Sequence, residues 1–581
     1  MLNMKQQIIN SINIKCMKKN LMTLAVVLCC WVTTAVLTAC TSDNDDNPVT
    51  GRIVGKWYSD VSGKTSALWN YGKCWQVTEL KADGTGSTDI YYLSDDKAIA
   101  REHSDFTYTA AEESMLTKGM QKADAGMAAK FNQWSNTEDM ISVPQPAKFT
   151  VFVYGNAGGT MDNAIEDGFW DKAKDFLKDH NNVRVVCLYK YGKDLPEEGK
   201  PFSGKYANPG DIVWFELTSE TDLSKIKEEG MQAIGMGKEA IEMKICDPKA
   251  LKMFMEFSSL SCPAKEYVFG VWGHGSGFVP MNDIPNKYEL PRSATRGVMY
   301  DEWNNDEELD MYEFRDAIKA SGIDRLNTIF FHNCMMGNLE TVTTVNDCAD
   351  YICCSAHVLS SNGEVLTEFV RGLVDKGNAE DAVAQMFENI TPSWQNGYSE
   401  GESSTNGDFK MYRTDKFTPI LDAAKHLADR LIALYPTQKE AIDRATSKVY
   451  RYAQFQATYI YPFFDIADYA HLLAQETGDA QMKTIADEMD KAFNDAIIHY
   501  RDVNWSKEHL DHYTLSICLV NSTLYNYQKC KEDINPSYLC NFNEGYEQCD
   551  FHKYTGWGNW LRINEQELKH NPQCGGGGPL E

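Results

Sequence analysis

The sequence predicts an α/β protein with a mostly parallel β-sheet flanked by helices, a small N-terminal β-rich domain and a helix-rich C-terminal part. Two observations predict this fold class. Between residues 147 and 365, buried-type apolar strands alternate with helical stretches, and a strand–helix–strand unit implies parallel strands. Two of these strands also end in turns rich in glycine and polar residues, the edge at which open α/β sheets bind ligands.

The N-terminus is predicted to be a secretory signal. Met17 is followed by two lysines, residues 21–36 are apolar and uncharged, and Leu-Thr-Ala precedes Cys40. A basic start, a short apolar core and small residues before a cut site are typical of export signals. The run is shorter than the about 20 residues that a membrane-spanning helix needs. We expect residues 1–39 to be removed, with Met17 as the start of the signal.

The cysteine that ends this segment resembles that of a bacterial lipobox, which implies that Cys40 is lipidated and anchors the chain to a membrane. An ordinary signal peptide with an incidental cysteine is the alternative. Residues 40–50 are polar and acidic, as in a flexible tether, and resemble the export tag of surface lipoproteins of Bacteroidetes-like bacteria. This implies an exported lipoprotein of the outer membrane or cell surface, with a periplasm-facing anchor as the alternative.

The charge balance excludes one class of partner. The formal net charge is −27, and the loss of four lysines and no acids with residues 1–39 takes it to −31. Phosphate binding needs clustered Lys and Arg, so no nucleic-acid partner is expected. Of the 17 cysteines, 13 remain after Cys40, and no Cys/His spacing is typical of zinc. Loop-like positions could form bridges of unassigned pairing: Cys530, Cys540, Cys549 and Cys574.

Residues 51–145 are predicted to be a small β-rich domain. A Gly-x-Trp opening at Gly55 is followed by an alternating strand at 77–80 and by turn residues at 82–86. This pattern resembles the lipocalin-like modules at the front of such lipoproteins. A spacer or pro-segment of any small β fold is the alternative.

Residues 147–365 are predicted to be the core of the sheet. The expected strands cover 148–153, 183–189, 266–272, 326–331 and 351–355, and the expected helices cover 169–177, 248–257 and 312–321. Residues 366–568 are predicted to be helix-rich. Apolar residues between 421 and 435 fall on one helical face, two helices are expected in 463–500, and a strand in 514–520. Residues 569–581 are expected to be a flexible tail.

A histidine and a cysteine follow two of the predicted strands directly. The first strand ends in Gly273-His274-Gly275 and the second in His332-Asn333-Cys334. Both turns face the same crevice if the strands are neighbours. An imidazole near a thiol favours the reactive thiolate and can protonate a leaving amine. Flanking glycines allow close approach of substrate, and the amides of Gly275 and Cys334 could bind an oxyanion. The stretch after Cys334 is expected to start a helix, whose positive end favours thiolate.

The order strand–His-Gly, then strand–Cys, resembles that of the caspase-like clan of cysteine peptidases. Within that clan, the segment Asn333-Cys334-Met335-Met336-Gly337 is similar to the cysteine segment of the clostripain family, and further similarity covers roughly residues 147–568. The resemblance implies a caspase-like fold and a cysteine endopeptidase. It implies His274 as general base and acid, Cys334 as nucleophile, and a peptide or protein as substrate.

The sequence departs from this family where family members that cleave after Arg or Lys carry acids. His332 stands two residues before the cysteine, and Ala356 stands where a glutamate is expected. Two carboxylates for a basic P1 side chain are therefore missing, so we predict an enzyme that is not strictly Arg/Lys-specific. Another acid, for example in 300–310, is the alternative. Self-cleavage in the family implies candidate sites at Lys287, Arg292 and Arg296.

Calcium dependence occurs in the family, but Asp301, Asp306 and Glu307 are merely acidic. We therefore predict no cofactor and assign no metal site, while calcium stays open as what the family resemblance implies. Three competing hypotheses stay open at this stage. The chain could be an inactive peptidase of the same fold, or another Cys-His hydrolase such as an amidase. It could also be a surface lipoprotein that binds peptide or glycan, with tryptophans of the β-rich domain as a stacking platform: Trp57, Trp69 and Trp75.

Overall fold

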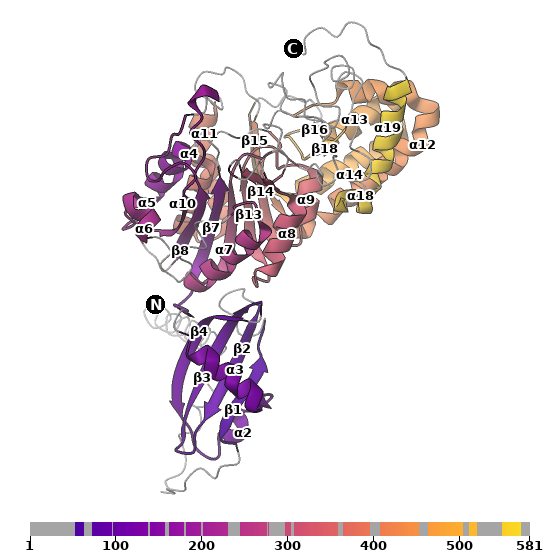
Figure 1. The fold of residues 1–581 in the computed structure, drawn as a ribbon. Helices are drawn as coiled ribbons and strands as arrows, with labels where there is room; N and C mark the ends of the chain where they lie inside the picture. The colour runs from indigo at the N-terminus through magenta and orange to yellow at the C-terminus, as the bar shows by residue number, and fades with distance from the viewer. Residues whose placement is uncertain are drawn as a thin grey trace, which may run out of the picture. The chain divides into compact units, whose positions relative to one another are not determined.

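The fold is taken from a computed structural model (Figure 1). The structure describes residues 53–62, 72–95, 97–137, 140–156, 162–178, 182–198, 201–229, 244–275, 277, 297–301, 303, 307–357, 359, 364–395, 407–452, 463–503, 510–519, 546 and 549–570. The chain divides into two compact units, and the boundary along the sequence falls between Pro146 and Ala147. A short stretch, Ser259–Lys265, groups with the first unit.

The first unit contains a six-stranded sheet in the order β5-β1-β2-β3-β4-β6. Its long strands pair antiparallel, and α3 packs against one face of the sheet through a small apolar cluster around Tyr91, Phe131 and Trp134. Trp75 belongs to this packing, since its ring stacks on Tyr58 at 5.7 Å. The elements are β1 (Gly55–Asp60), β2 (Cys74–Leu80), β3 (Thr85–Ser94), β4 (Lys97–Thr107), α2 (Glu113–Leu116), β5 (Gln121–Lys122), α3 (Ala125–Ser135) and β6 (Ile141–Ser142).

The second unit is built on an eight-stranded sheet in the order β17-β15-β14-β13-β10-β7-β8-β9. Its centre is parallel, because β13 pairs in parallel with both β10 and β14, and β7 pairs in parallel with β8. The edges are antiparallel at β9, β15 and β17. The strands are β7 (Ala147–Asn156), β8 (Val183–Lys190), β9 (Ile212–Leu217), β10 (Ala264–Gly273), β13 (Leu326–His332), β14 (Ala349–Cys354), β15 (Gly407–Arg413) and β17 (Ile497–Val503).

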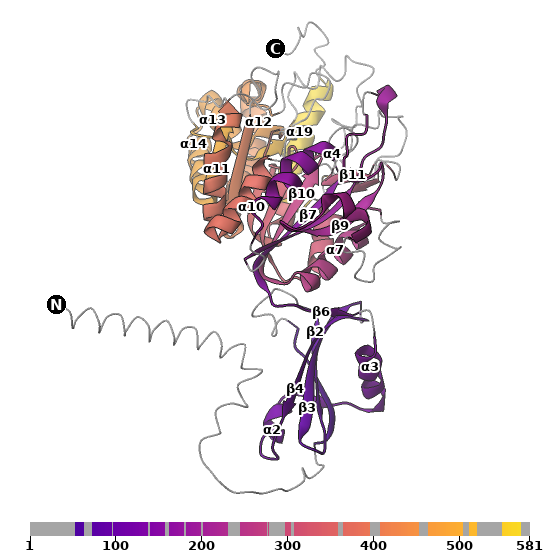
Figure 2. The same ribbon diagram turned by 90° about the vertical axis from the view of Figure 1, so that its left-hand side faces the viewer.

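Helices cover both faces of this sheet, as two perpendicular views show (Figures 1 and 2). On one face, α10 and α11 pack over the main apolar cluster together with the α4–α5 segment. On the other face lie α7, α8 and α9. The elements are α4 (Asp162–Ile165), a π-helical turn (Glu166–Trp170), α5 (Asp171–Lys174), α6 (Ile226–Glu229), α7 (Pro248–Ser261), α8 (Met311–Ala320), α9 (Leu339–Val345), α10 (Glu364–Lys376) and α11 (Ala379–Gln395).

The predicted fold class is confirmed, but two strands of the sheet were missed in the part predicted to be helix-rich. β15 carries Asp408 and Lys410, both buried, within a sequence that lacks the apolar run of an inner strand. β17 follows α14 without a break, and its sequence is also mixed. A strand that buries charged side chains lacks the hydrophobic periodicity by which strands are recognised in a sequence, and both strands were therefore missed. The sheet extends well beyond residue 365.

The C-terminal helices α12, α13, α14, α18 and α19 pack together beyond the sheet (Figure 1). A two-stranded sheet of β16 and β18 lies next to the turn after β13, since Ser516 N donates to Gly337 O at 2.9 Å. In the described part of the chain, none of the helices is long and apolar enough to cross a bilayer. The elements are α12 (Thr418–Lys448), β16 (Phe463–Asp465), α13 (Ile466–Thr477), α14 (Ala480–Ala496), β18 (Ser516–Cys518), α18 (Asp550–Thr555) and α19 (Trp557–His570), with β11 (Met299–Asp301) and β12 (Glu307–Leu309) as a separate pair.

Candidate active site

The register of β10 and β13 aligns the two predicted catalytic residues. Trp272 pairs directly with His332 in the parallel ladder. His274 and Cys334 each lie two residues beyond this pair, so both leave the sheet at the same edge. The ring of His332 stacks on Trp272 with centroids 4.2 Å apart, which fixes the last residues of the two strands against each other. The turn that carries His274 and the turn that carries Cys334 therefore lie side by side, as the sequence predicted for neighbouring strands.

Glycines on both sides of His274 are required by close packing of backbone. Gly273 has φ of +138°, and a Cβ there would lie 2.1 Å from the carbonyl oxygen of Asn156 at the end of β7. A Cβ on Gly275 would lie 2.6 Å from the carbonyl oxygen of Cys334. The sequence interpretation assigned these glycines to close approach of substrate. In the structure the neighbouring strand ends fill the space, so the glycines bring the histidine turn onto the cysteine turn.

The Cys334 thiol is half-buried and lies beside the backbone of Leu359. Leu359 N donates to Sγ at 3.4 Å, and the thiol donates to Leu359 O at 3.8 Å. Burial raises the pKa of Cys334 to about 11, although the Leu359 amide acts in the opposite direction. The isolated thiol is therefore protonated at neutral pH, and a thiolate requires a base that accepts the proton.

The segment after Cys334 is a turn, and helix α9 starts only at Leu339. Met335 adopts φ of +57°, an uncommon conformation for a residue other than glycine. Asn338 caps the helix by accepting from Thr341 N at 2.8 Å. The helix start that the sequence predicted is present, but it lies five residues beyond the cysteine. Because the electrostatic effect of a helix terminus decays within the first turn, the start of α9 contributes little to a thiolate at Cys334.

The two predicted pocket residues have different surroundings. His332 is 4% exposed, and burial lowers its pKa to about 4, so its ring is neutral at physiological pH. It belongs to the stack on Trp272. Ala356 is part of an apolar cluster against which Cys334 itself packs. The other members of that cluster are Met335, Tyr452, Phe463 and Tyr513, with Tyr450 packed against it.

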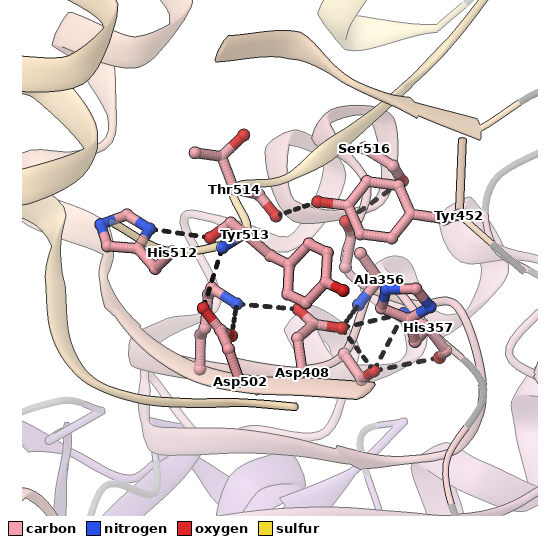
Figure 3. Close-up of polar contacts among 12 residues, drawn as sticks. Ala356, His357, Asp408, Tyr452, Asp502, His512, Tyr513, Thr514 and Ser516 are labelled. Carbon is pink, nitrogen blue, oxygen red and sulfur yellow. Dashed lines mark hydrogen bonds and ion pairs between the residues drawn. The ribbon is translucent and has the colours of Figure 1, made fainter. Parts of the chain in front are cut away.

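Sequence reasoning missed the residues that support Ala356 from beneath. Asp408 on β15 accepts hydrogen bonds from the amides of Ala356 and His357, both at 3.0 Å (Figure 3). The tyrosines of the cluster come from loops far along the chain, on either side of α13 and α14. A buried charge in a strand is a signal of function or of a structural network, but β15 was not recognised as a strand.

The acidic residues near 300–310 are engaged elsewhere as far as the structure describes them. Asp301 is fully buried and accepts from Lys190 Nζ at 2.9 and 2.7 Å. Asp310 caps helix α8. Among the described residues, no group of three or more His, Cys, Asp or Glu side chains is placed to hold a metal ion. Asp306 and the Glu307 side chain lie outside the described residues, as do Lys287, Arg292 and Arg296.

Several other predicted features also lie outside the described residues. These are the signal, Cys40 and the tether, together with Trp69, Cys530, Cys540 and Cys574. Cys549 is a buried free thiol that caps helix α18 by accepting from His552 N at 3.2 Å. Within the described ranges, no two cysteines are joined by a disulfide.

A mostly parallel sheet flanked by helices gives the protein a caspase-like α/β fold, with a histidine and a cysteine at adjoining strand ends. The model of the clostripain family matches residues 173–561, about two thirds of the chain. The protein therefore belongs to the clostripain family of cysteine peptidases.

Solved structures of related proteins are similar at low sequence identity. A secreted C11 cysteine protease from Bacteroides thetaiotaomicron, in complex with an irreversible peptide inhibitor, is 14% identical with a TM-score of 0.46, and the match covers 71% of this chain and 99% of that one. A secreted C11 cysteine protease from the same organism, "iotapain", is 15% identical with a TM-score of 0.47, over 71% of this chain and 100% of that one. An inactive zymogen C11 protease from Parabacteroides distasonis is 15% identical with a TM-score of 0.46, over 71% and 99%. A comparison with curated proteins finds no match.

Proposed function

We propose that the protein is a cysteine endopeptidase in which Cys334 is the nucleophile and His274 is the general base and acid. The observation that carries the proposal is the pairing of Trp272 with His332, since it places both residues at one edge of the sheet. The contact of Gly275 with the Cys334 carbonyl supports it, because that contact leaves little freedom between the two turns.

The chemistry follows from the surroundings of the thiol. Because the pKa of Cys334 is raised to about 11 by burial, His274 takes the proton as Sγ attacks the scissile carbonyl. The imidazolium then donates that proton to the leaving amine, which gives a thioester with the amino-terminal part of the substrate. Water, deprotonated by His274, hydrolyses the thioester and regenerates the thiol.

Charge develops on the carbonyl oxygen in both addition steps. We propose the amides of Gly275 and Cys334 as its donors, since both belong to the adjoining turns. Within the described residues, neither amide donates to a backbone carbonyl. One such donor is worth about 3–4 kcal/mol in acyl transfer.

The P1 side chain is proposed to be neutral, and the enzyme is proposed not to be strictly specific for Arg or Lys. His332 is neutral and stacked, and Ala356 has no polar group. Asp408, which contacts the backbone of Ala356, uses one carboxylate oxygen for that backbone and the other for Lys410. The apolar and aromatic cluster beside Cys334 suits a P1 residue recognised through shape and stacking.

We further propose that the mature chain begins at Cys40, carries a lipid there and acts at the outer membrane or cell surface. The signal-like sequence and acidic tether support this, as does the description of a family structure as a secreted protease. No cofactor is assigned, because the chemistry of a thiol and an imidazole needs none. The alternative of a binding protein has less support, since Trp75 packs inside the β-rich unit against Phe131 and Trp134.

The test is cleavage of a diverse peptide library by residues 41–581, read by mass spectrometry, with calcium and reductant varied. Cys334→Ala and His274→Ala are the matched variants. We expect cleavage by the wild type only, with neutral residues at P1.

A sharp Arg/Lys profile would refute the proposed pocket while keeping the peptidase. Equal cleavage by Cys334→Ala would refute the nucleophile. An inactive wild type whose Cys334 also resists a thiol-reactive probe would favour the inactive or binding alternative.

A further inference from the structure

A buried charge network lies directly beneath the turn that carries Ala356. Lys410 Nζ is within 3.0 Å of Asp408 Oδ2 and 2.7 Å of Asp502 Oδ1, and the lysine is 0% exposed. The two carboxylates and one ammonium come from the neighbouring strands β15 and β17. Burying such groups is costly unless every one of them is paired, and here each carboxylate contacts the ammonium.

The carboxylate oxygen of Asp408 that does not contact Lys410 organises the 355–357 turn (Figure 3). Asp408 Oδ1 accepts from Ser355 Oγ at 2.9 Å and from the amides of Ala356 and His357 at 3.0 Å each. Three donors on one carboxylate oxygen are charge-assisted hydrogen bonds, which are roughly twice as strong as neutral ones. Although burial alone would raise the pKa of Asp408, Lys410 together with the side chain and backbone amide of His357 holds it below its usual value.

The same turn holds the backbone that follows the nucleophile. Met335 N donates to His357 O at 2.9 Å, and Gly337 N donates to Ser355 O at 2.7 Å. The strained conformation of Met335 is thus maintained by a contact with the turn that Asp408 fixes. Two residues beyond the turn, Leu359 N donates to Cys334 Sγ at 3.4 Å. Asp408 therefore connects to the nucleophile by two short routes, one through the Met335 amide and one through the Leu359 amide.

Asp502 provides an internal comparison. It pairs with the same lysine but makes no hydrogen bond to the 355–357 turn within the described residues. Its other oxygen accepts from Tyr513 N at 2.8 Å, and the Tyr513 ring packs against His357 with centroids 4.8 Å apart. Both aspartates pair with Lys410, and their side chains are 2% and 8% exposed, but only Asp408 accepts hydrogen bonds from the 355–357 turn.

We propose that Asp408 is a positioning residue for Cys334: it fixes the 355–357 turn so that the Leu359 amide reaches Sγ and the Met335 turn keeps its geometry. This inference rests on the proposed function. Lys410 keeps the carboxylate ionised and oriented, and Asp502 completes the pairing of the lysine.

The experiment uses the full mature chain and two readouts. The first is kcat and KM on the best library peptide. The second, which needs no turnover, is the pH dependence of Cys334 alkylation by iodoacetamide, followed by mass spectrometry. In Asp408→Asn, the amide group replaces a carboxylate that faces both Lys410 and the turn. We expect kcat to fall about 10- to 100-fold, KM to change less than about threefold, and the alkylation midpoint to move to higher pH.

Asp502→Asn is the matched control, since it removes the same charge from the same lysine. We expect kcat within about threefold of wild type and an unchanged alkylation midpoint. Ser355→Ala removes one contact to Asp408 without changing charge, and it keeps the test decisive if Asp408→Asn does not fold. Its kcat is expected to fall about threefold to tenfold, with a smaller shift of the midpoint in the same direction.

Equal losses of kcat in Asp408→Asn and Asp502→Asn, or an unmoved alkylation midpoint in both Asp408→Asn and Ser355→Ala, would overturn the proposal and leave the network a stabilising feature only. If the wild type cleaves no peptide, the proposed function fails, and the alkylation midpoints alone then decide whether Asp408 positions Cys334.

Discussion

Glu340 makes the stability of the peptidase unit depend on pH. It lies on α9, six residues after Cys334, and is completely buried. Its Oε1 accepts from Tyr546 OH at 2.6 Å and from Cys518 N at 3.1 Å, while Oε2 has no partner among the described residues. Burial raises its pKa from 4.5 to about 7. The folded protein therefore holds this proton more tightly than the unfolded chain does.

The sign of the effect follows from this difference. The unfolded carboxyl loses its proton near pH 4.5, whereas the folded one keeps it up to about pH 7. Stability is therefore greatest below pH 4.5 for this group, falls as pH rises through the window from 4.5 to 7, and then levels off. A shift of this size corresponds to about 3 kcal/mol in total, of which about 2.5 kcal/mol falls between pH 5 and pH 8.

The perturbation is Glu340→Gln, which keeps one acceptor oxygen and removes the titration. The free energy of unfolding would be measured by urea titration at pH 5 and pH 8 for the variant and the wild type. The unpaired amide protons of the new glutamine cost about 1–3 kcal/mol of stability at both pH values. This cost cancels when the two pH values are compared. We expect the variant to gain about 2.5 kcal/mol relative to wild type between the two pH values. Exposed Glu220→Gln is the control, and an equal change in both variants would refute the reasoning.

Three further predictions follow from the site and its surroundings. Gly275→Ala places a methyl group 2.6 Å from the Cys334 carbonyl oxygen, so kcat should fall by about 100-fold with an unchanged circular dichroism spectrum; activity within threefold of wild type would contradict the packing of the two turns. In His274→Ala, Cys334 should be alkylated with a midpoint near the pKa of about 11 that burial imposes, whereas the wild type should react at lower pH; identical profiles would show that His274 does not act on the thiol. Lys190→Met removes the ammonium that both oxygens of buried Asp301 contact, and a buried carboxylate without its counter-charge should cost about 3–5 kcal/mol in urea unfolding. Adding Asp301→Leu to the same chain should recover much of that loss, and a Lys190→Met variant as stable as wild type would show that the ion pair does not stabilise the fold.

The sequence alone determined the fold class, the family and the two candidate catalytic residues. Apolar runs of strand length between helical stretches specify a parallel sheet, because only such strands are buried on both faces. His274 and Cys334 could be chosen because each directly follows a run of this kind. These are local signals, and local patterns of hydrophobicity survive in a sequence without knowledge of its contacts.

Only the tertiary structure decided what surrounds the pair. β15 and β17 join the sheet through buried charges that pair with each other, and nothing local in either segment shows that pairing. The roles of Gly273, Gly275 and His332 changed for the same reason. Their neighbours, Asn156, the Cys334 carbonyl and Trp272, are distant in the sequence or belong to another strand. The surroundings of a catalytic thiol are set by contacts between segments, and these are fixed by packing of the whole unit.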